Sequence, residues 1–122
     1  DIEEIGITYL DMIPNEILLK LVEDNLVKMG EHIDIYERPA GVASTDVGNL
    51  SHRFPAIQVM ISIDDPSLPH TEPFAKACAG KRGADIAVRA AKALAYTGVD
   101  LFNDPSLVDK AKEELKERVS TK

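Results

Sequence analysis

Apolar residues recur at every third or fourth position after Asn15, and this spacing predicts an amphipathic helix. Asn15 is suited to cap the first turn, because its side chain can accept a hydrogen bond from a free main-chain N–H group. Gly30 stands where the helix should end, since glycine readily adopts the left-handed conformation that follows many helices. The pattern therefore predicts a helix from Asn15 to Met29 with its apolar face in the core.

The same kind of spacing predicts three more helices in the second half of the chain. Thr71 is suited to cap the first of them, and Asp104-Pro105 supplies a cap and a first-turn proline for the last. The middle helix is rich in alanine, which permits close approach to a neighbouring element. The predicted spans are residues 71–79, residues 83–102 and residues 104–122.

Alternating apolar residues predict a β-strand between Ile57 and Ile63. Isoleucine or valine occupies every second position there, and a methionine lies on the other face, so both faces of the strand are suited to burial. Shorter strands are predicted over residues 5–9 and residues 32–36. Together with the helices, these strands predict an α/β fold in which helices flank a mixed sheet.

Two polar segments flank the predicted strand and hold most of the candidate binding residues. The loop over residues 40–49 contains Ser44, Thr45 and Asp46, which can offer hydroxyl groups, a carboxylate and free N–H groups together. His70 follows the strand, just before the helix expected at residue 71. Because binding groups collect where strands end and helices begin, we expect these two segments to form part of an active site.

Composition and charge narrow the possible partners. The 122 residues suffice for one domain, and 14 basic against 21 acidic side chains give a net charge of −7. This balance, without a basic stripe, argues against nucleic acid or an anionic membrane as a partner. No apolar run approaches the ~20 residues of a membrane span. The single cysteine, Cys78, is expected to be a buried thiol, which suits a reducing, cytoplasmic setting.

Four motifs, taken in order along the chain, resemble one known family. They are Ser44-Thr45-Asp46-Val47-Gly48-Asn49, His70-Thr71-Glu72-Pro73-Phe74, the alanine-rich segment over residues 90–101, and Asp104-Pro105-Ser106-Leu107. From residue 15 onward the chain is similar to the carboxyl-terminal part of the zinc-dependent aminoacylase and carboxypeptidase superfamily. Within that superfamily it most resembles the branch that holds the aminobenzoyl-glutamate hydrolase B subunit and related dipeptidases and amidohydrolases.

This resemblance implies a partial three-layer α/β/α catalytic domain of the zinc-peptidase type. In such enzymes an inserted lid domain interrupts the catalytic domain, and residues 1–122 would be the segment that follows the lid. The absence of a methionine at Asp1 also suggests a piece of a longer chain. The implied activity is hydrolysis of amide bonds in N-acyl amino acids or dipeptides, with one or two zinc ions. The isolated 122-residue chain is expected to be inactive.

The resemblance also implies roles for individual residues. His70 occupies the position of a metal ligand, and a neutral imidazole suits zinc, which makes bound water a nucleophile near neutral pH. His52 is a candidate to orient a metal ligand or the substrate. No catalytic residue is assigned in this segment, because no His-x-Asp, His-x-His or Glu-Glu pair lies near His70 and Glu113-Glu114 is interpreted as a solvated pair. The substrate side of the site would be lined by Ser44, Thr45, Asp46 and Asn49.

Each candidate also has a simpler structural interpretation. His70 can be a histidine that caps or hydrogen-bonds the start of a helix. Asp46 can shape its loop through an Asx-turn or a helix cap, and its polar neighbours can be turn residues. His52 can be a partly exposed loop histidine. Local sequence alone does not decide between these alternatives.

A rival function is open for the chain as a whole. It can be a free-standing acidic α/β interaction or regulatory module that keeps the family's scaffold without its chemistry. The enzyme interpretation implies three partners: a small amide or dipeptide substrate, the remainder of the catalytic domain, and a second copy bound through the lid. An upstream region with the missing metal ligands would discriminate between enzyme and module.

Overall fold

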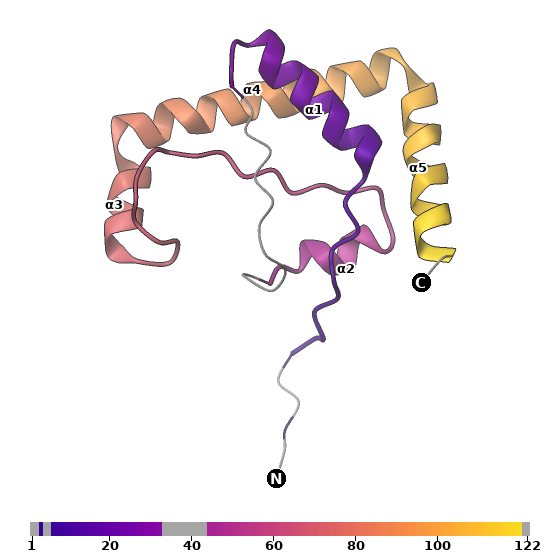
Figure 1. Cartoon of the computed structure of the whole chain (residues 1–122), viewed down its shortest axis with the longest axis horizontal. Helices are drawn as coiled ribbons and strands as arrows, with labels where there is room; N and C mark the ends of the chain where they lie inside the picture. Colours follow the sequence, from indigo (N-terminus) through magenta and orange to yellow (C-terminus); the bar gives the residue numbers. More distant parts are fainter. Residues whose placement is uncertain (1–2, 4–5, 33–43, 121–122) are drawn as a thin grey trace.

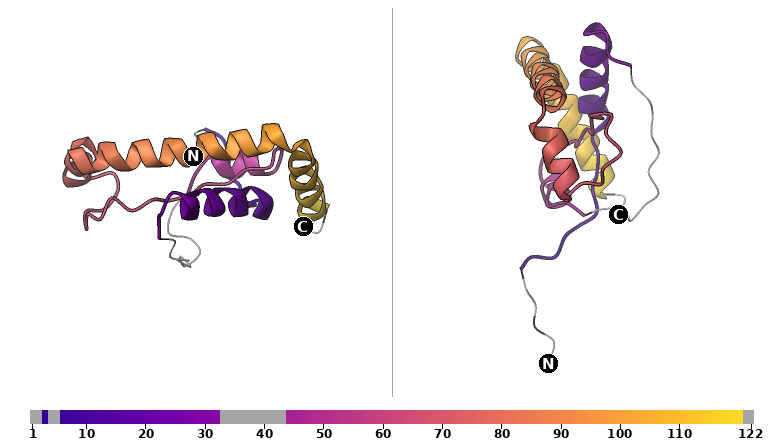
Figure 2. Two further views of the ribbon diagram at one scale, coloured as in Figure 1. Left: turned by 90° about the horizontal axis from the view of Figure 1, so that it is seen from above. Right: turned by 90° about the vertical axis from the view of Figure 1, so that its left-hand side faces the viewer.

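The computed structural model describes residues 3, 6–32 and 44–120, and most of these residues are helical. Helix α4 is the longest, and the other elements are arranged along it (Figure 1). Helix α1 packs against α4, while α3 and α5 fold back from its two ends, as the views from above and from the side also show (Figure 2). The helices are α1 (Glu16–Lys28), α2 (Val47–Ser51), α3 (Glu72–Ala79), α4 (Lys81–Asn103) and α5 (Pro105–Ser120).

The predicted α/β fold with a mixed sheet is wrong for the part of the chain that the structure describes. No strand or sheet forms there, and the only strand-like pairing is an isolated parallel bridge between Pro14 and Ala56. Residues 57–63 are extended but unpaired. Ile57 and Ile61 pack instead against the core between α1 and α4, so helices rather than neighbouring strands cover one face of this segment. A strand needs a hydrogen-bonded neighbour, and no described segment supplies one.

The two shorter predicted strands have different outcomes. Residues 7–9 form no strand, and Ile7 and Tyr9 are exposed, so their alternation reflects no buried face. The second segment, residues 32–36, lies outside the described residues except for His32, which is exposed.

The predicted helix starts and stops are confirmed by the capping contacts. Asn15 accepts a hydrogen bond from the main-chain N–H of Leu18 at 3.1 Å, which satisfies a free donor of the first turn of α1. Gly30, directly after the last turn, has a φ of +81°, a conformation that glycine adopts without the strain other residues incur. The hydroxyl of Thr71 caps α3 by accepting from the N–H of Phe74 at 3.4 Å.

The core is small and lies along the seam between α1 and α4. Val22, Leu26 and Ala93 are buried there, with three partly buried hydrophobic residues packed around them. Helix α4 also carries exposed apolar side chains outside this seam, since Leu94 and Phe102 are 61% and 88% exposed. Exposed apolar side chains of this kind on a helix mark a surface that packs against something else.

Cys78 corrects a second expectation, because its thiol is exposed rather than buried. It lies on α3, a short helix without buried residues whose packing partner is α4. The flanking alanines that suggested burial belong to a helix that, among the described helices, packs against α4 alone. The exposed Cys78 thiol therefore does not support the reducing, cytoplasmic setting that a buried thiol suggested.

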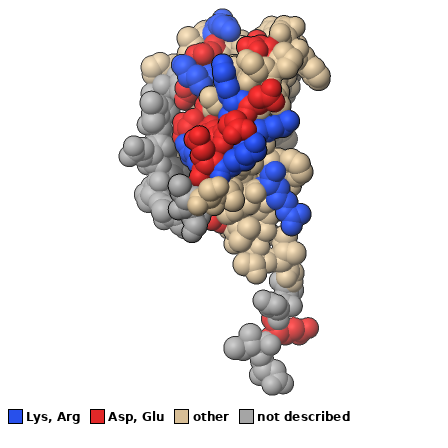
Figure 3. Space-filling model, turned by 90° about the vertical axis from the view of Figure 1, so that its right-hand side faces the viewer, with Lys and Arg blue, Asp and Glu red and all other residues tan. Residues whose placement is uncertain are grey.

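The surface charges are of both signs. Figure 3 looks onto the end of the molecule where α5 lies, and acidic and basic side chains alternate over it without a single-sign patch. Charged side chains elsewhere in the described residues also form short-range pairs, such as Lys116 with Glu113 and Lys20 with Asp24. Among the described residues no helix is long and apolar enough to cross a bilayer.

Candidate functional site

His70 lies in the turn that leads into α3, and its backbone is in the left-handed region with a φ of +65°. Non-glycine residues adopt this region rarely, because the Cβ atom crowds the following carbonyl oxygen. The imidazole is exposed and makes no hydrogen bond or ion pair with the described residues. Thr71, not His70, caps the helix. The imidazole is thus free for a ligand that the described residues do not supply.

Asp64, the other non-glycine residue with positive φ in the described segments, is a useful contrast. Its carboxylate accepts a hydrogen bond from Ser62 at 3.1 Å and pairs with the guanidinium of Arg82. Local contacts therefore account for the conformation of Asp64. The positive φ of His70 also has a local setting, because His70 follows Pro69 in a turn that Thr71 spans by donating from its hydroxyl to the Leu68 carbonyl at 2.7 Å. The contrast with Asp64 lies in the imidazole, which has no partner among the described residues.

Ser44, Thr45 and Asp46 lead into the short helix α2, which the sequence pattern did not predict. Ser44 and Asp46 are exposed, and Asp46 makes no side-chain capping bond. The Thr45 hydroxyl accepts from the main-chain N–H of Val47 at 3.3 Å, an arrangement that starts the helix turn. The three side chains leave most of their hydrogen-bonding capacity open to solvent.

Asn49 is used differently, because its amide holds a neighbouring extended segment. Its Nδ2 donates to the carbonyl of Thr8 at 2.9 Å, and its Oδ1 accepts from the N–H of Leu10 at 3.2 Å. The Asn49 amide thus bonds to one main-chain carbonyl and one main-chain N–H of this segment, as a paired β-strand would. We name residues 7–13 the strap, since they cross α2 as an extended segment.

Two further side chains of α2 and its end hold the strap. The buried hydroxyl of Ser51 accepts from the N–H of Ile13 at 2.9 Å and donates to the carbonyl of Gly48 at 2.6 Å. The Nε2 atom of His52 lies 2.9 Å from the carbonyl oxygen of Asp11 and 3.4 Å from its carboxylate. His52 is thereby positioned against the strap rather than beside His70.

Gly48 completes this contact through its lack of a side chain. A Cβ atom at this position would overlap the carbonyl oxygen of Leu10. The strap therefore approaches the backbone of α2 as closely as only glycine permits. The motif that suggested a substrate loop is divided: residues 44–46 are open, and residues 48–52 hold the strap.

The turn that carries His70 and the helix that follows Asp46 lie apart in the fold. The turn is at one end of the molecule beside α3, and α2 lies below its middle (Figure 1). Within the described segments no group of three His, Cys, Asp or Glu side chains is placed to hold a metal ion. A catalytic zinc ion has three protein ligands as a rule, so the described residues do not make a complete zinc site.

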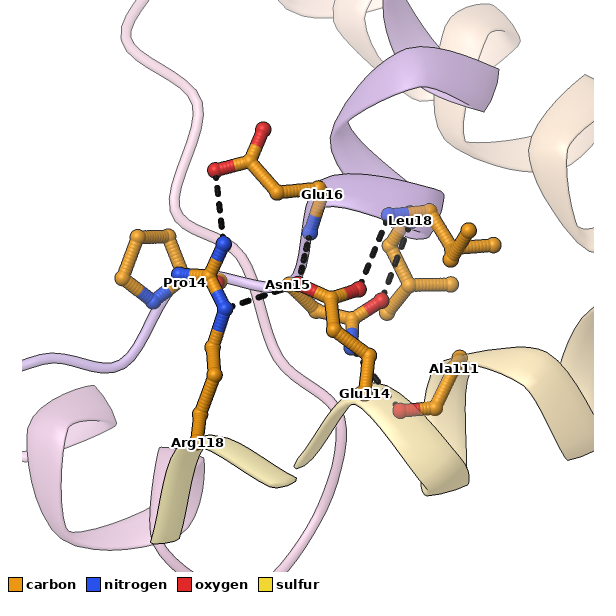
Figure 4. Close-up of polar contacts among 8 residues, drawn as sticks. Pro14, Asn15, Glu16, Leu18, Ala111, Glu114 and Arg118 are labelled. Carbon is orange, nitrogen blue, oxygen red and sulfur yellow. Dashed lines mark hydrogen bonds and ion pairs between the residues drawn. The ribbon is translucent and has the colours of Figure 1, made fainter. Parts of the chain in front are cut away.

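A polar cluster at the start of α1 was missed by the sequence analysis. The carboxylate of Glu114 accepts from the main-chain N–H groups of Glu16 at 2.8 Å and Ile17 at 3.2 Å (Figure 4). Arg118 donates to the carbonyl of Pro14 and pairs with Glu16, both at 3.1 Å. Glu114 therefore lies against α1, whereas the sequence placed it on a solvated surface.

Two shallow grooves of about 420 Å³ each run along the seam between α1 and α4. They share Met29 and Tyr96, and neither contains a residue of the candidate loops. In one of them Asn25 donates to Asp100 at 2.8 Å, so its amide is engaged in joining the helices. These grooves are features of helix packing and hold no candidate catalytic group.

Two curated proteins are similar to this chain over most of its length. Xaa-Arg dipeptidase of Mus musculus is 34% identical over 120 residues, covering 95% of this chain and 27% of the mouse protein. Xaa-Arg dipeptidase of Homo sapiens is 34% identical over 112 residues, covering 88% of this chain and 25% of the human protein. The chain thus spans about a quarter of the length of these relatives.

No protein-family model matches the chain, and no solved structure matches it. The similarity to the two dipeptidases supports the dipeptidase and amidohydrolase class that the motifs suggested. Neither relative is an aminobenzoyl-glutamate hydrolase, so that finer resemblance stays a prediction.

Proposed function

We propose that this chain forms part of a metal-dependent amidohydrolase that cleaves dipeptides or N-acyl amino acids. The observation that carries the proposal is the 34% identity to Xaa-Arg dipeptidase across 95% of the chain. The shared class of reaction is hydrolysis of an amide bond next to an amino acid. We further propose that the protein acts in the cytoplasm.

In this proposal His70 supplies one ligand to a zinc site. Two features support the choice: its imidazole is exposed, and it has no hydrogen-bond or ion-pair partner among the described residues. Because the described residues offer no cluster of three ligating groups, the other ligands and the glutamate that activates water would come from outside the described residues. Zinc, when bound, would polarise the scissile carbonyl group and activate water.

The open half of the 44–52 segment is the proposed substrate side. Ser44 and Asp46 are exposed, so they can reach a bound amide or its charged end. Asn49 was also a substrate candidate, but both polar ends of its amide are engaged by the strap. Direct contact of Asn49 with substrate would require the strap to move. His52 has the same requirement, since its Nε2 faces the Asp11 carbonyl.

The exposed apolar side chains of α4 fit the proposed partner, which is the remainder of the catalytic domain. Val88, Leu94 and Phe102 are all more than half exposed. Alanines lie between them in sequence, so another layer of structure could approach the helix closely. A second copy bound through a lid domain is proposed on the resemblance alone.

The rival interpretation, an interaction module without catalysis, predicts a different experimental result. The test is to purify the intact protein that contains this segment and to measure hydrolysis of dipeptides and N-acyl amino acids with and without chelator. Turnover that chelator removes and zinc restores supports the proposal. A folded intact protein without turnover on either substrate class supports the module and overturns the proposal.

A further inference from the structure

Main-chain groups dominate the contact between the strap and α2. Asn49 engages the carbonyl of Thr8 and the N–H of Leu10, and Ser51 engages the N–H of Ile13. His52 faces the carbonyl of Asp11. All four are main-chain groups that most peptides offer at the same positions, so these contacts select an extended backbone. The one side-chain contact of His52 is to the Asp11 carboxylate, at 3.4 Å.

The side chains of the strap contribute unequally. Ile7, Tyr9 and Leu10 are 70%, 57% and 44% exposed, so they point largely away from the protein. Ile13 is 5% exposed and is the apolar anchor at the far end. The strap is therefore held through its main-chain groups and one buried side chain, as an extended peptide would be, although side chains and not a strand edge hold it.

From this geometry we infer that Gly48, Asn49, Ser51 and His52 form a site that recognises an extended peptide with one apolar anchor residue. The strap occupies this site as an intramolecular ligand. Gly48 lets the peptide backbone approach, Asn49 binds its N–H and carbonyl groups, and Ser51 fixes the residue that anchors it. The site is independent of hydrolysis and of metal, so it stands or falls separately from the proposed function.

A tethered ligand has an effective concentration in the millimolar range, so the strap should exclude free peptide from the wild-type site. The test uses the full 122-residue chain and a fluorescent peptide with the sequence of residues 6–14. Leu10→Pro in the chain removes the N–H that donates to Asn49 while leaving α2 unchanged. Fluorescence anisotropy should show at least about tenfold tighter peptide binding to this variant than to wild type.

Three modified peptides separate backbone recognition from side-chain recognition. Methylation of the Leu10 nitrogen should remove binding, because that N–H donates to Asn49. Replacement of Ile13 by aspartate should also remove binding, whereas alanine at positions 8–10 should change affinity less than about threefold, since those side chains are largely exposed. An N-methylated peptide that binds as well as the unmodified one would overturn the inference.

Two controls keep the result interpretable. Circular dichroism establishes that Leu10→Pro retains the helices, and Leu10→Pro combined with Asn49→Ala should lose the gained peptide binding. If Leu10→Pro does not fold, hydrogen exchange of the wild-type chain provides the second measurement. The N–H groups of Leu10 and Ile13 should then exchange more slowly than that of Tyr9. Equal exchange, or a folded Leu10→Pro chain that binds no peptide, contradicts the inference.

Discussion

The carboxylate of Glu114 on α5 accepts a 2.8 Å hydrogen bond from the main-chain N–H of Glu16, 98 residues earlier in the chain. It accepts a second from Ile17, so one side chain satisfies two free donors of the first turn of α1. A negative charge at this end of a helix is also favoured by the helix dipole. Glu114 thus joins the last described helix to the first.

Glu114→Ala should lower the free energy of unfolding by about 1–2 kcal/mol, because it leaves two N–H groups at a partly buried helix start without their acceptor. Urea denaturation followed by circular dichroism measures the change. Glu113→Ala is the matched control, since Glu113 is exposed and pairs with Lys116 three residues away. Its expected loss is below about 0.5 kcal/mol. Equal effects from both substitutions would contradict the role given to Glu114.

Gly48→Ala should destabilise the chain by about 1–3 kcal/mol, because the added methyl group overlaps the Leu10 carbonyl and forces the strap away. Gly98→Ala is the control. Nothing lies within 4 Å of a Cβ placed at Gly98, in the interior of α4. That substitution should stabilise the chain by about 0.5–1 kcal/mol. Thermal unfolding of both variants measures the opposite signs, and a stabilising Gly48→Ala would be incompatible with the observed close approach.

If the intact protein has the proposed activity, His70→Ala should abolish nearly all turnover and lower the zinc content, because it removes a proposed metal ligand. His52→Ala should change turnover far less than His70→Ala, because His52 contacts the strap and lies apart from His70. Activity and elemental analysis on the same samples measure both effects. His70→Ala with full zinc occupancy and normal turnover would remove His70 from the site.

His70→Gly in the 122-residue chain tests whether the positive φ of His70 costs folding free energy, apart from any role of the imidazole as a metal ligand. Glycine adopts a φ of +65° freely, so this variant should be more stable than wild type by up to about 1 kcal/mol. His70→Ala gains nothing, since alanine is strained there too. Denaturation of the three chains measures the difference. A less stable glycine variant would mean that the imidazole contributes contacts to the fold.

Asp104 provides a prediction about pH. Hydrogen bonds from the side chain and the main chain of Ser106 hold the pKa of Asp104 below its ordinary value of 3.8. Because the folded pKa is depressed, the contribution of this carboxylate to the start of α5 is fully present above pH 3.8 and is lost as the pH falls through the lower folded value. An NMR titration should find the Asp104 midpoint below that of an unfolded control peptide. An equal or higher midpoint would contradict the prediction.

Local sequence determined the helices well, because their ends depend on neighbours a few residues away. Asn15 and Thr71 cap the helices that their positions predicted, and Gly30 follows α1 as expected. Short helix α2 was missed, since it is only five residues long and begins among turn-forming residues. Helix ends are therefore readable from short windows of sequence.

The predicted sheet failed for a reason that local sequence does not contain. The alternation over Ile57–Ile63 describes side chains suited to burial, but pairing depends on a second segment with free N–H and carbonyl groups. Among the described residues, α1 and α4 cover Ile57 and Ile61 instead. The candidate site has the same limit, because the engagement of Asn49 by the strap is visible only in three dimensions.

The link between Arg118 and Glu16 has a consequence for the ribosome-bound nascent chain. Arg118 and Glu16 are 102 residues apart in sequence, so α1 leaves the ribosome long before the α5 residues that hold the first turn of α1 are made. Until then Asn15 alone caps α1 from within its own segment. Because distant contacts form slowly, we expect α1 to open and close repeatedly during synthesis, and chaperones that bind exposed apolar segments would have access to Val22 and Leu26 in that interval.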